Sequence, residues 1–83
     1  MSAYTIRTAG HAWELAYAAG TDAANRQMRA AGRTRWNLDD RNLSAERTNR
    51  MLTSMGFLDA SGVPTSLYFA MRADRSAPFV IPD

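Results

Sequence analysis

The chain contains no cysteine and no lysine, and it has a single histidine among its 83 residues. Without cysteine it can form neither a disulfide framework nor a thiolate metal site. The lone histidine, His11, cannot supply the several ligands of a zinc centre. Asp39 and Asp40 lack the Asp-x-Asp-x-Asp-Gly spacing of a calcium loop and are better explained as the acidic start of a helix. We therefore expect no metal site and no cofactor.

Long apolar runs are also missing. No stretch approaches the roughly 18 consecutive apolar residues that a membrane span requires. The N-terminus, Met1 to Tyr4, does not begin a basic region followed by an apolar one, as a signal peptide would. Because the absence of cysteine is typical of a reducing compartment, the sequence predicts a cytoplasmic protein that does not bind a membrane.

The composition is typical of one small folded domain. Hydrophobic residues make up 46% of the chain and charged residues 22%, the usual proportions for a globular protein. A chain this short buries only about 60% of the surface that its unfolded form exposes, so its core is modest. We therefore predict a single domain over residues 1–83, to which a partner surface or self-association adds stability.

Small and apolar residues recur every three or four positions from about residue 11 to residue 31, which predicts a helix. The stripe expected to face the core consists of Trp13, Tyr17, Gly20, Ala24, Met28 and Ala31. A second stripe beside it consists of Ala12, Ala16, Ala19, Ala23 and Ala30. Side chains this small let another backbone approach closely, and Gly32 is placed to end the helix.

Asn37 followed by two aspartates predicts the start of a second helix, because asparagine caps a helix N-terminus and acids are favoured in its first turn. This helix is expected from about residue 38 to residue 55, with Gly56 after its end. Its apolar stripe is interrupted by polar residues and consists of Leu38, Ala45, Leu52 and Met55. A helix with so weak an apolar face needs a partner helix to be stable.

The connection between the two helices is short, from Gly32 to Trp36, which predicts an antiparallel pair. Trp36 is expected to cover one end of the core. Asn42 and Asn49 are unfavourable inside a helix, so we expect them either to hydrogen-bond across the pair and fix its register or to face a partner chain. For Asn25, a position on the surface is at least as good an explanation.

Short β elements are predicted on both sides of the helices. Residues 3 to 8 alternate with the period of a half-buried strand, and Phe79 to Ile81, between two prolines, are typical of an edge strand. Residues 59 to 62 form a turn cluster that predicts a hairpin or tight loop. Residues 65 to 75 fit either a helix or a strand, and Tyr68 and Phe69 favour the strand. The predicted fold class is α+β: an antiparallel helix pair, about 11–31 and 38–55, with short β elements at the N-terminus and in the C-terminal third.

Material for catalysis is scarce. A nucleophilic triad would need a serine or threonine beside His11 and a carboxylate such as Glu14. No glycine-flanked serine motif or phosphate-binding glycine loop is present, and Glu14 is simply a helical neighbour of His11. We expect no catalytic residues and no enzymatic activity, so the remaining functions are forms of binding.

The most distinctive feature is the placement of arginine. Seven of the ten arginines lie between residues 26 and 50 against three acids, a local net charge of +4. Three of them share a face of the first helix and two share a face of the second, so adjacent faces would form a basic stripe that binds an anion. The candidate partner-binding residues are Arg26, Arg29, Arg33, Arg35, Trp36, Arg47 and Arg50. A solvated face, partly neutralised by the pairs Asp22–Arg26 and Glu46–Arg50, is the alternative.

Three binding functions are compatible with this pattern. The first is a non-catalytic protein whose arginine-rich helix pair docks on an acidic protein surface. The second is a small nucleic-acid-binding module of winged-helix type, in which the second helix enters a groove and residues 57 to 68 form a wing-like hairpin. The third is a homodimeric structural protein whose seam is the alanine face of the first helix.

The stretch AYAAGTDAANRQMRAAGRTRWNLDDRNLSAERTNRML, residues 16 to 52, resembles small accessory proteins encoded by phages and prophages of GC-rich bacteria. The likeness lies in the pattern Ala-Gly-x-Asp-Ala-Ala-Asn-Arg, the turn Gly-Arg-Thr-x-Trp-Asn and the acidic helix start after it. The resemblance implies a protein that works in the cytoplasm of a bacterial host and disables a host protein or nucleoprotein complex, as anti-CRISPR proteins do. Many anti-CRISPR proteins are acidic, whereas this chain is basic, which favours docking on an acidic protein surface over mimicry of DNA.

Overall fold

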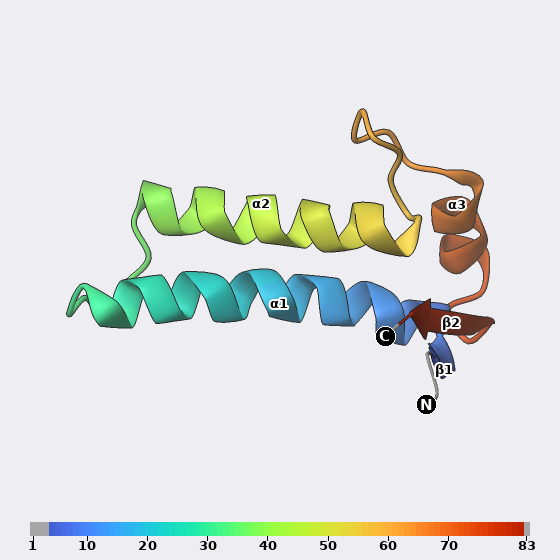
Figure 1. Cartoon of the computed structure of the whole chain (residues 1–83), viewed down its shortest axis with the longest axis horizontal. Helices are drawn as coiled ribbons and strands as arrows, with labels where there is room; N and C mark the ends of the chain where they lie inside the picture. Colours follow the sequence, from blue (N-terminus) through green and yellow to red (C-terminus); the bar gives the residue numbers. More distant parts are fainter. Residues whose placement is uncertain (1–3, 83) are drawn as a thin grey trace.

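The computed structural model describes residues 4–82 of the chain, and the side chains of residues 8–79. Five elements follow one another: β1 (Tyr4–Thr8), α1 (Ala9–Ala30), α2 (Leu38–Met55), α3 (Ser66–Ala73) and β2 (Pro78–Pro82). The two long helices lie side by side and antiparallel, while α3 and both strands gather at one end of the pair (Figure 1). The predicted antiparallel helix pair is confirmed, and the molecule is mostly helical.

Helix α1 begins two residues earlier than expected because Thr8 caps it. The Thr8 hydroxyl oxygen accepts a hydrogen bond from the backbone N–H of His11 at 3.2 Å, which satisfies one of the free donors of the first turn. At the other end Gly32 adopts a φ of +72°. The backbone N–H of Arg33 donates to the carbonyl of Met28 at 3.0 Å, so a left-handed glycine ends the helix as predicted.

The face that α1 turns toward α2 is made of its smallest residues. Its buried residues are Ala9, Gly10, Ala12, Ala16, Gly20 and Ala24. A Cβ on Gly20 would lie closer than 3.0 Å to both Thr48 Oγ1 and the backbone carbonyl oxygen of Ser44. The helices therefore approach so closely at this point that only glycine fits.

This close approach corrects the predicted core stripe of α1. Tyr17 is 51% exposed, Ala31 is also exposed and Met28 is only half-buried. Bulky side chains cannot stand between two backbones in contact, so they are displaced to the flanks of the interface. Gly20 and Ala24 of that stripe are buried as predicted, and the second, alanine stripe adds Ala12 and Ala16, which are both fully buried.

Helix α2 has the bounds predicted from its caps. Asn37 and Asp40 form a capping box: each side chain accepts a hydrogen bond from the other residue's backbone N–H, at 2.9 Å in both cases. Gly56 ends the helix with a φ of +90°. Its predicted stripe is half right, since Leu52 and Met55 are buried but Leu38 is 70% exposed and Ala45 is also exposed. Asp40 and Thr48 are buried in their place.

The core lies where the start of α1, the end of α2, α3 and β2 meet. Phe57, just after α2, is fully buried at its centre. Its ring stacks on Phe79 with the centroids 5.2 Å apart and meets the Trp13 ring edge-on at 5.7 Å. The other buried residues of this cluster are Ala9, Ala12, Ala16, Leu52, Met55 and Met71.

The C-terminal third contains one wrong prediction. Residues 66–73 form α3, so the preference for a strand is wrong and the helical alternative is confirmed. Leu67 and Met71, four residues apart, both pack into the core, and this burial overrides the β propensity of the neighbouring aromatic residues. The predicted tight loop is confirmed: it is closed by a single antiparallel bridge between Leu58 and Pro64, with Asp59 capping the turn.

Both predicted terminal strands are confirmed, except that Ala3 lies outside the described residues. Strands β1 and β2 pair antiparallel, with Thr8 opposite Pro78 and Ile6 opposite Val80. They form a two-stranded sheet, which brings the two ends of the described chain together (Figure 1). Because the helix pair lies between the strands in sequence, this pairing closes the fold around the core.

Candidate functional site

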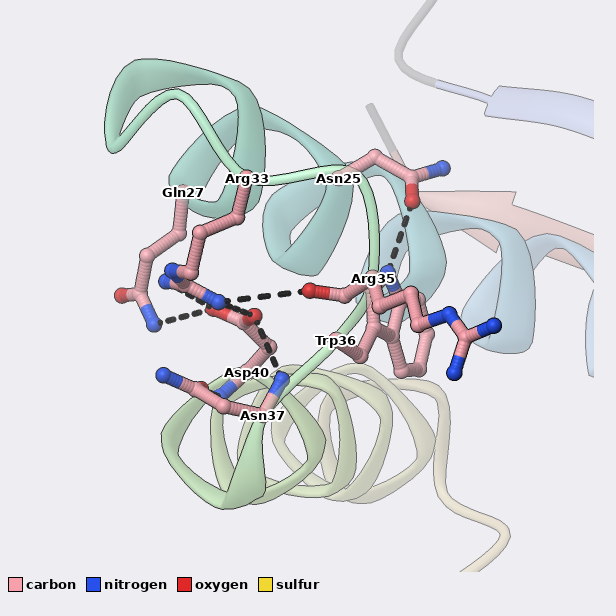
Figure 2. Close-up of polar contacts among 7 residues, drawn as sticks. All are labelled: Asn25, Gln27, Arg33, Arg35, Trp36, Asn37 and Asp40. Carbon is pink, nitrogen blue, oxygen red and sulfur yellow. Dashed lines mark hydrogen bonds and ion pairs between the residues drawn. The ribbon is translucent and has the colours of Figure 1, made fainter.

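The connection between α1 and α2 is fixed by a network around a buried carboxylate. Asp40 is fully buried and forms an ion pair with Arg33, whose two terminal nitrogens donate to both of its oxygens. The carboxylate also accepts from the Gln27 side chain at 2.8 Å and from the Asn37 backbone N–H at 2.9 Å. Figure 2 shows these four residues converging on one side of the connection. We call Gln27, Arg33, Asn37 and Asp40 the loop clamp.

The loop clamp determines the charge state of its members. The Arg33 guanidinium lowers the pKa of Asp40 well below its usual range, and the bonds from Asn37 and Gln27 lower it further. The same contact raises the pKa of Arg33. Arg33 therefore neutralises a buried charge inside the protein, and both of its terminal nitrogens are already engaged by Asp40.

Replacing Asp40 with asparagine should lower the melting temperature at pH 7 by roughly 5–10 °C, because Arg33 loses its counter-charge and the capping box weakens. The folded-state pKa of Asp40 is depressed, so its contribution is present above the unfolded value of about 3.9 and is lost as pH falls through the folded value. The difference in melting temperature between wild type and Asp40→Asn should thus shrink below about pH 4. Thermal scans from pH 7 to pH 2 measure it.

The matched control is Asp39→Asn, which removes an exposed acid from the same first turn of α2. It should shift the melting temperature far less, since only a favourable helix-dipole contact is lost. Equal shifts for the two variants, or a pH-independent difference for Asp40→Asn, would contradict a structural role for the buried carboxylate.

Trp36 anchors the opposite side of the same connection. It is half-buried, and its indole N–H donates to Asn25 Oδ1 at 2.8 Å. In Figure 2 the Trp36 ring and the Arg35 side chain lie on the side away from Arg33, with Asn25 above the ring. Asn25, for which a surface position was at least as good an explanation, is instead half-buried and hydrogen-bonded. Its role explains one asparagine in the helix pair, whereas Asn42 and Asn49 are exposed.

The predicted arginine stripe is not one surface. Arg33 is engaged in the loop clamp, whereas Arg35 lies on the other side of the connection (Figure 2). Arg29 follows Gly20 by nine residues, or about two and a half helical turns, so it lies on the face of α1 opposite to α2. Arg47 and Arg50 do lie together in one groove. Arg26 shares the side of α1 that bears Ala19, seven residues before it. The structure therefore brings together part of the candidate set and separates the rest.

Arg47 and Arg50 belong to a groove on one side of the helix pair. Its volume is about 360 Å³, and its lining residues are Ala19, Arg47, Arg50, Met51 and Ser54. Met51 is 37% exposed. Leu15, which is 36% exposed, lies one turn before Ala19 on the same side of α1. Arg50 pairs with Glu46 at 3.5 Å, with both side chains exposed. We call this surface the arginine groove.

A second groove lies on the other side of the buried stripe through Ala16 and Gly20. It encloses about 270 Å³ and is lined by Tyr17, Trp36, Arg41, Ser44, Ala45, Thr48 and Asn49. We call it the aromatic pocket. Sequence reasoning did not find Tyr17 and Arg41 as site residues, because Tyr17 matched the period of the core. The signal that could have indicated an outward position for Tyr17 was its large size beside the alanines and the glycine of the same helix face.

A third cleft, of about 360 Å³, contains the only histidine together with Thr8, Gly10, Glu14, Arg75 and Ser76. Here the Ser76 hydroxyl donates to Asp74 at 2.6 Å, and Glu14 accepts from Arg75 at 2.9 Å. Within residues 8–79, no hydrogen bond joins the His11 imidazole to Ser76 or Glu14, so the serine and the carboxylate serve other partners. The bonds from Ser76 lower the pKa of Asp74. We do not propose catalysis at this cleft.

No metal-ligand cluster and no membrane-spanning helix is found among residues 4–82. No group of three or more histidine, cysteine, aspartate or glutamate side chains among these residues is placed to hold a metal ion. None of the described helices is long and apolar enough to cross a membrane.

Comparisons with known proteins add no relative. A scan against protein-family models, a search of curated proteins and a search of solved structures each found no match. The function proposed below therefore rests on the geometry of the chain and on the resemblance of residues 16–52.

Proposed function

We propose that this protein is a non-catalytic binding protein that docks on the acidic surface of another protein through its arginine groove. The observation that carries the proposal is the position of Arg47 and Arg50 beside an apolar floor in one open groove. Charged forks that flank an apolar centre are the usual anatomy of a protein-binding hot spot.

The groove suits a partner that presents carboxylates around an apolar side chain. Arginine binds carboxylates through two parallel hydrogen bonds, and Met51 supplies an adaptable apolar contact. Both side chains of the Arg50–Glu46 pair are largely exposed and the pair is therefore weak, so a partner carboxylate can replace Glu46 at little cost. Arg26, on the same side of α1, extends the positive surface beyond the groove. The net charge of +2 favours such an encounter.

The biological setting is proposed from the resemblance alone. A phage-encoded inhibitor of the anti-CRISPR type would use such a groove to dock on a bacterial host protein or nucleoprotein complex and block its function. A cytoplasmic location in the host belongs to the same proposal. What supports it is the pattern of residues 16–52, which includes most of both long helices.

The test compares two variants of equal net charge. Arg47→Gln/Arg50→Gln removes the two groove arginines, whereas Arg29→Gln/Arg72→Gln removes two exposed arginines from outside the groove. We expect a host protein captured from bacterial lysate by wild type to be retained by the second variant. The groove variant should bind it at least about ten-fold more weakly, as expected for the loss of two charge-assisted contacts. Equal binding by both variants would place the docking surface elsewhere.

Neither a winged helix nor a dimer through the alanine seam gains support from the geometry. The wing expected between residues 57 and 68 has only the single bridge Leu58–Pro64 and then continues into α3. The alanine seam expected for a homodimer is occupied within the chain, because Ala12 and Ala16 are fully buried. We therefore propose neither a winged-helix module nor a dimer through this face.

A further inference from the structure

We infer that the aromatic pocket binds a nucleoside monophosphate unit, a base with its phosphate, in a single-stranded nucleic acid. The pocket combines two aromatic side chains, an arginine and several neutral hydrogen-bonding groups. These groups match the three parts of a nucleotide: a flat π-face, a phosphate and a polar base edge. The inference does not depend on the arginine groove, since the two surfaces share no residue.

The aromatic side chains are already held in place. The Tyr17 ring packs against Trp13 with the centroids 5.4 Å apart, yet Tyr17 remains 51% exposed. Trp36 is fixed through its indole N–H by Asn25, so its polar edge is satisfied, and the residue also lines the pocket. Tyr17 and Asn25 are eight residues apart on α1, a distance of about 12 Å along the helix. The two aromatic side chains therefore line the pocket at positions about two turns of α1 apart.

The polar groups lie on the α2 wall of the pocket. Arg41 is exposed, and among residues 8–79 it takes part in no ion pair, so its guanidinium can bind a phosphate. Ser44 and Asn49 offer a hydroxyl and an amide that can both donate and accept hydrogen bonds, as a base edge requires. Arg35 lies on the same side of the connection as Trp36 (Figure 2) and is a further cation for a flanking phosphate.

Size and charge favour a nucleotide over an acidic peptide. A volume of about 270 Å³ is just below the range of roughly 300–1,000 Å³ for drug-sized ligands, which fits one nucleotide unit. The pocket wall carries one arginine and no apolar residue larger than alanine apart from its aromatic rings. An acidic peptide would instead prefer the arginine groove, with two arginines and the flexible Met51. Base stacking is tolerant of sequence, so we expect little preference among bases.

Trp36 reports directly on occupancy of the pocket. In a Trp13→Phe background it is the only tryptophan, and a stacked base should quench its fluorescence. The probes are short oligothymidylate and oligoadenylate, free adenosine monophosphate, and an acidic peptide without aromatic residues. We expect saturable quenching by both oligonucleotides at low salt. The affinity should fall with salt at a log–log slope of about −0.7 for each phosphate contacted.

Variants separate the pocket from general charge effects. In the same background, Tyr17→Leu keeps an apolar side chain against residue 13 but removes the stacking ring, and it should weaken binding by about ten-fold. Arg41→Gln should weaken binding and reduce the salt slope. Arg47→Gln/Arg50→Gln removes two charges from the arginine groove, one more than Arg41→Gln removes from the pocket. It should leave the affinity for the oligonucleotides within about two-fold of the background protein at moderate salt. Circular dichroism verifies that each variant is folded.

Each result decides the inference. Quenching that is lost in Tyr17→Leu and Arg41→Gln but kept in Arg47→Gln/Arg50→Gln supports it, and equal affinity for adenosine monophosphate would identify the free nucleotide as the source of the ligand. No quenching by any nucleotide at low salt overturns it. Quenching by the acidic peptide alone also overturns it and makes the pocket a protein-binding site. Loss of nucleotide binding only in Arg47→Gln/Arg50→Gln would overturn it too, while failure of host-protein capture has no bearing on it.

Discussion

Gly20→Ala should destabilise the protein by about 3 kcal/mol or more, although alanine is the better helix former by about 1 kcal/mol. The added methyl group would lie closer than 3.0 Å to Thr48 Oγ1 and to the backbone carbonyl oxygen of Ser44. A hydroxyl can rotate away, but a backbone oxygen inside a helix cannot, so the helices must separate. Chemical denaturation measures the loss, which is a large part of the roughly 5–15 kcal/mol that stabilises a typical domain.

Gly62→Ala is the matched control. Gly62 has a φ of +82° with nothing within 4 Å of an added Cβ, so alanine there suffers only the strain of a left-handed backbone, about 1–2 kcal/mol. Combining Gly20→Ala with Thr48→Ala should recover only part of the loss, because the Ser44 carbonyl remains. A stability of Gly20→Ala equal to wild type would mean that the helices are farther apart than the structure has them.

Phe57→Ala should cost about 3–5 kcal/mol. Phe57 is fully buried, stacks on Phe79 and meets Trp13 edge-on, so its removal leaves a cavity between the helix pair and β2. In a protein with one small core, a loss of this size should lower the melting temperature by more than roughly 12 °C. Trp13 packs on the Phe57 ring, so it reports on the same core. The near-ultraviolet circular dichroism signal of the variant should therefore be lost at its lowered melting temperature.

Phe69→Ala provides the comparison for that variant. Phe69 lies on α3 but is 59% exposed, so the same substitution should change stability by less than about 1 kcal/mol. If Phe57→Ala and Phe69→Ala behaved alike, the core would not be centred where α2 ends.

The spacing between α1 and α2 affects both proposed binding surfaces. The arginine groove and the aromatic pocket each take one wall from α1 and the other from α2, so the spacing set at Gly20 fixes the width of both. The loop clamp and the Trp36–Asn25 bond then fix the connection at one end of the pair. A variant that separates the helices should therefore weaken both binding functions together, whereas the groove and pocket variants act singly.

Local signals determined much of the secondary structure in advance. Asn37, the acids after it and the glycines at 32 and 56 gave the start and end of α2 and the end of α1, because caps depend on a few neighbouring backbone groups. The first strand was equally visible in its alternation, and the second in an apolar segment between two prolines. Residues 65–75 were ambiguous for the opposite reason, since a short apolar segment takes the form that its packing requires, and Leu67 and Met71 meet the core only as a helix.

The sequence by itself determined the two long helices, their antiparallel order and the concentration of arginine between residues 26 and 50. Only the tertiary structure decided which residues face which way, because periodicity ranks apolar side chains by character and not by size. The close contact at Gly20 selected alanine and glycine for the interface and moved Tyr17 outward into a pocket. In the same way a buried Asp40 took Arg33 out of the expected stripe, since a charge removed from water must be paired wherever the fold has placed it.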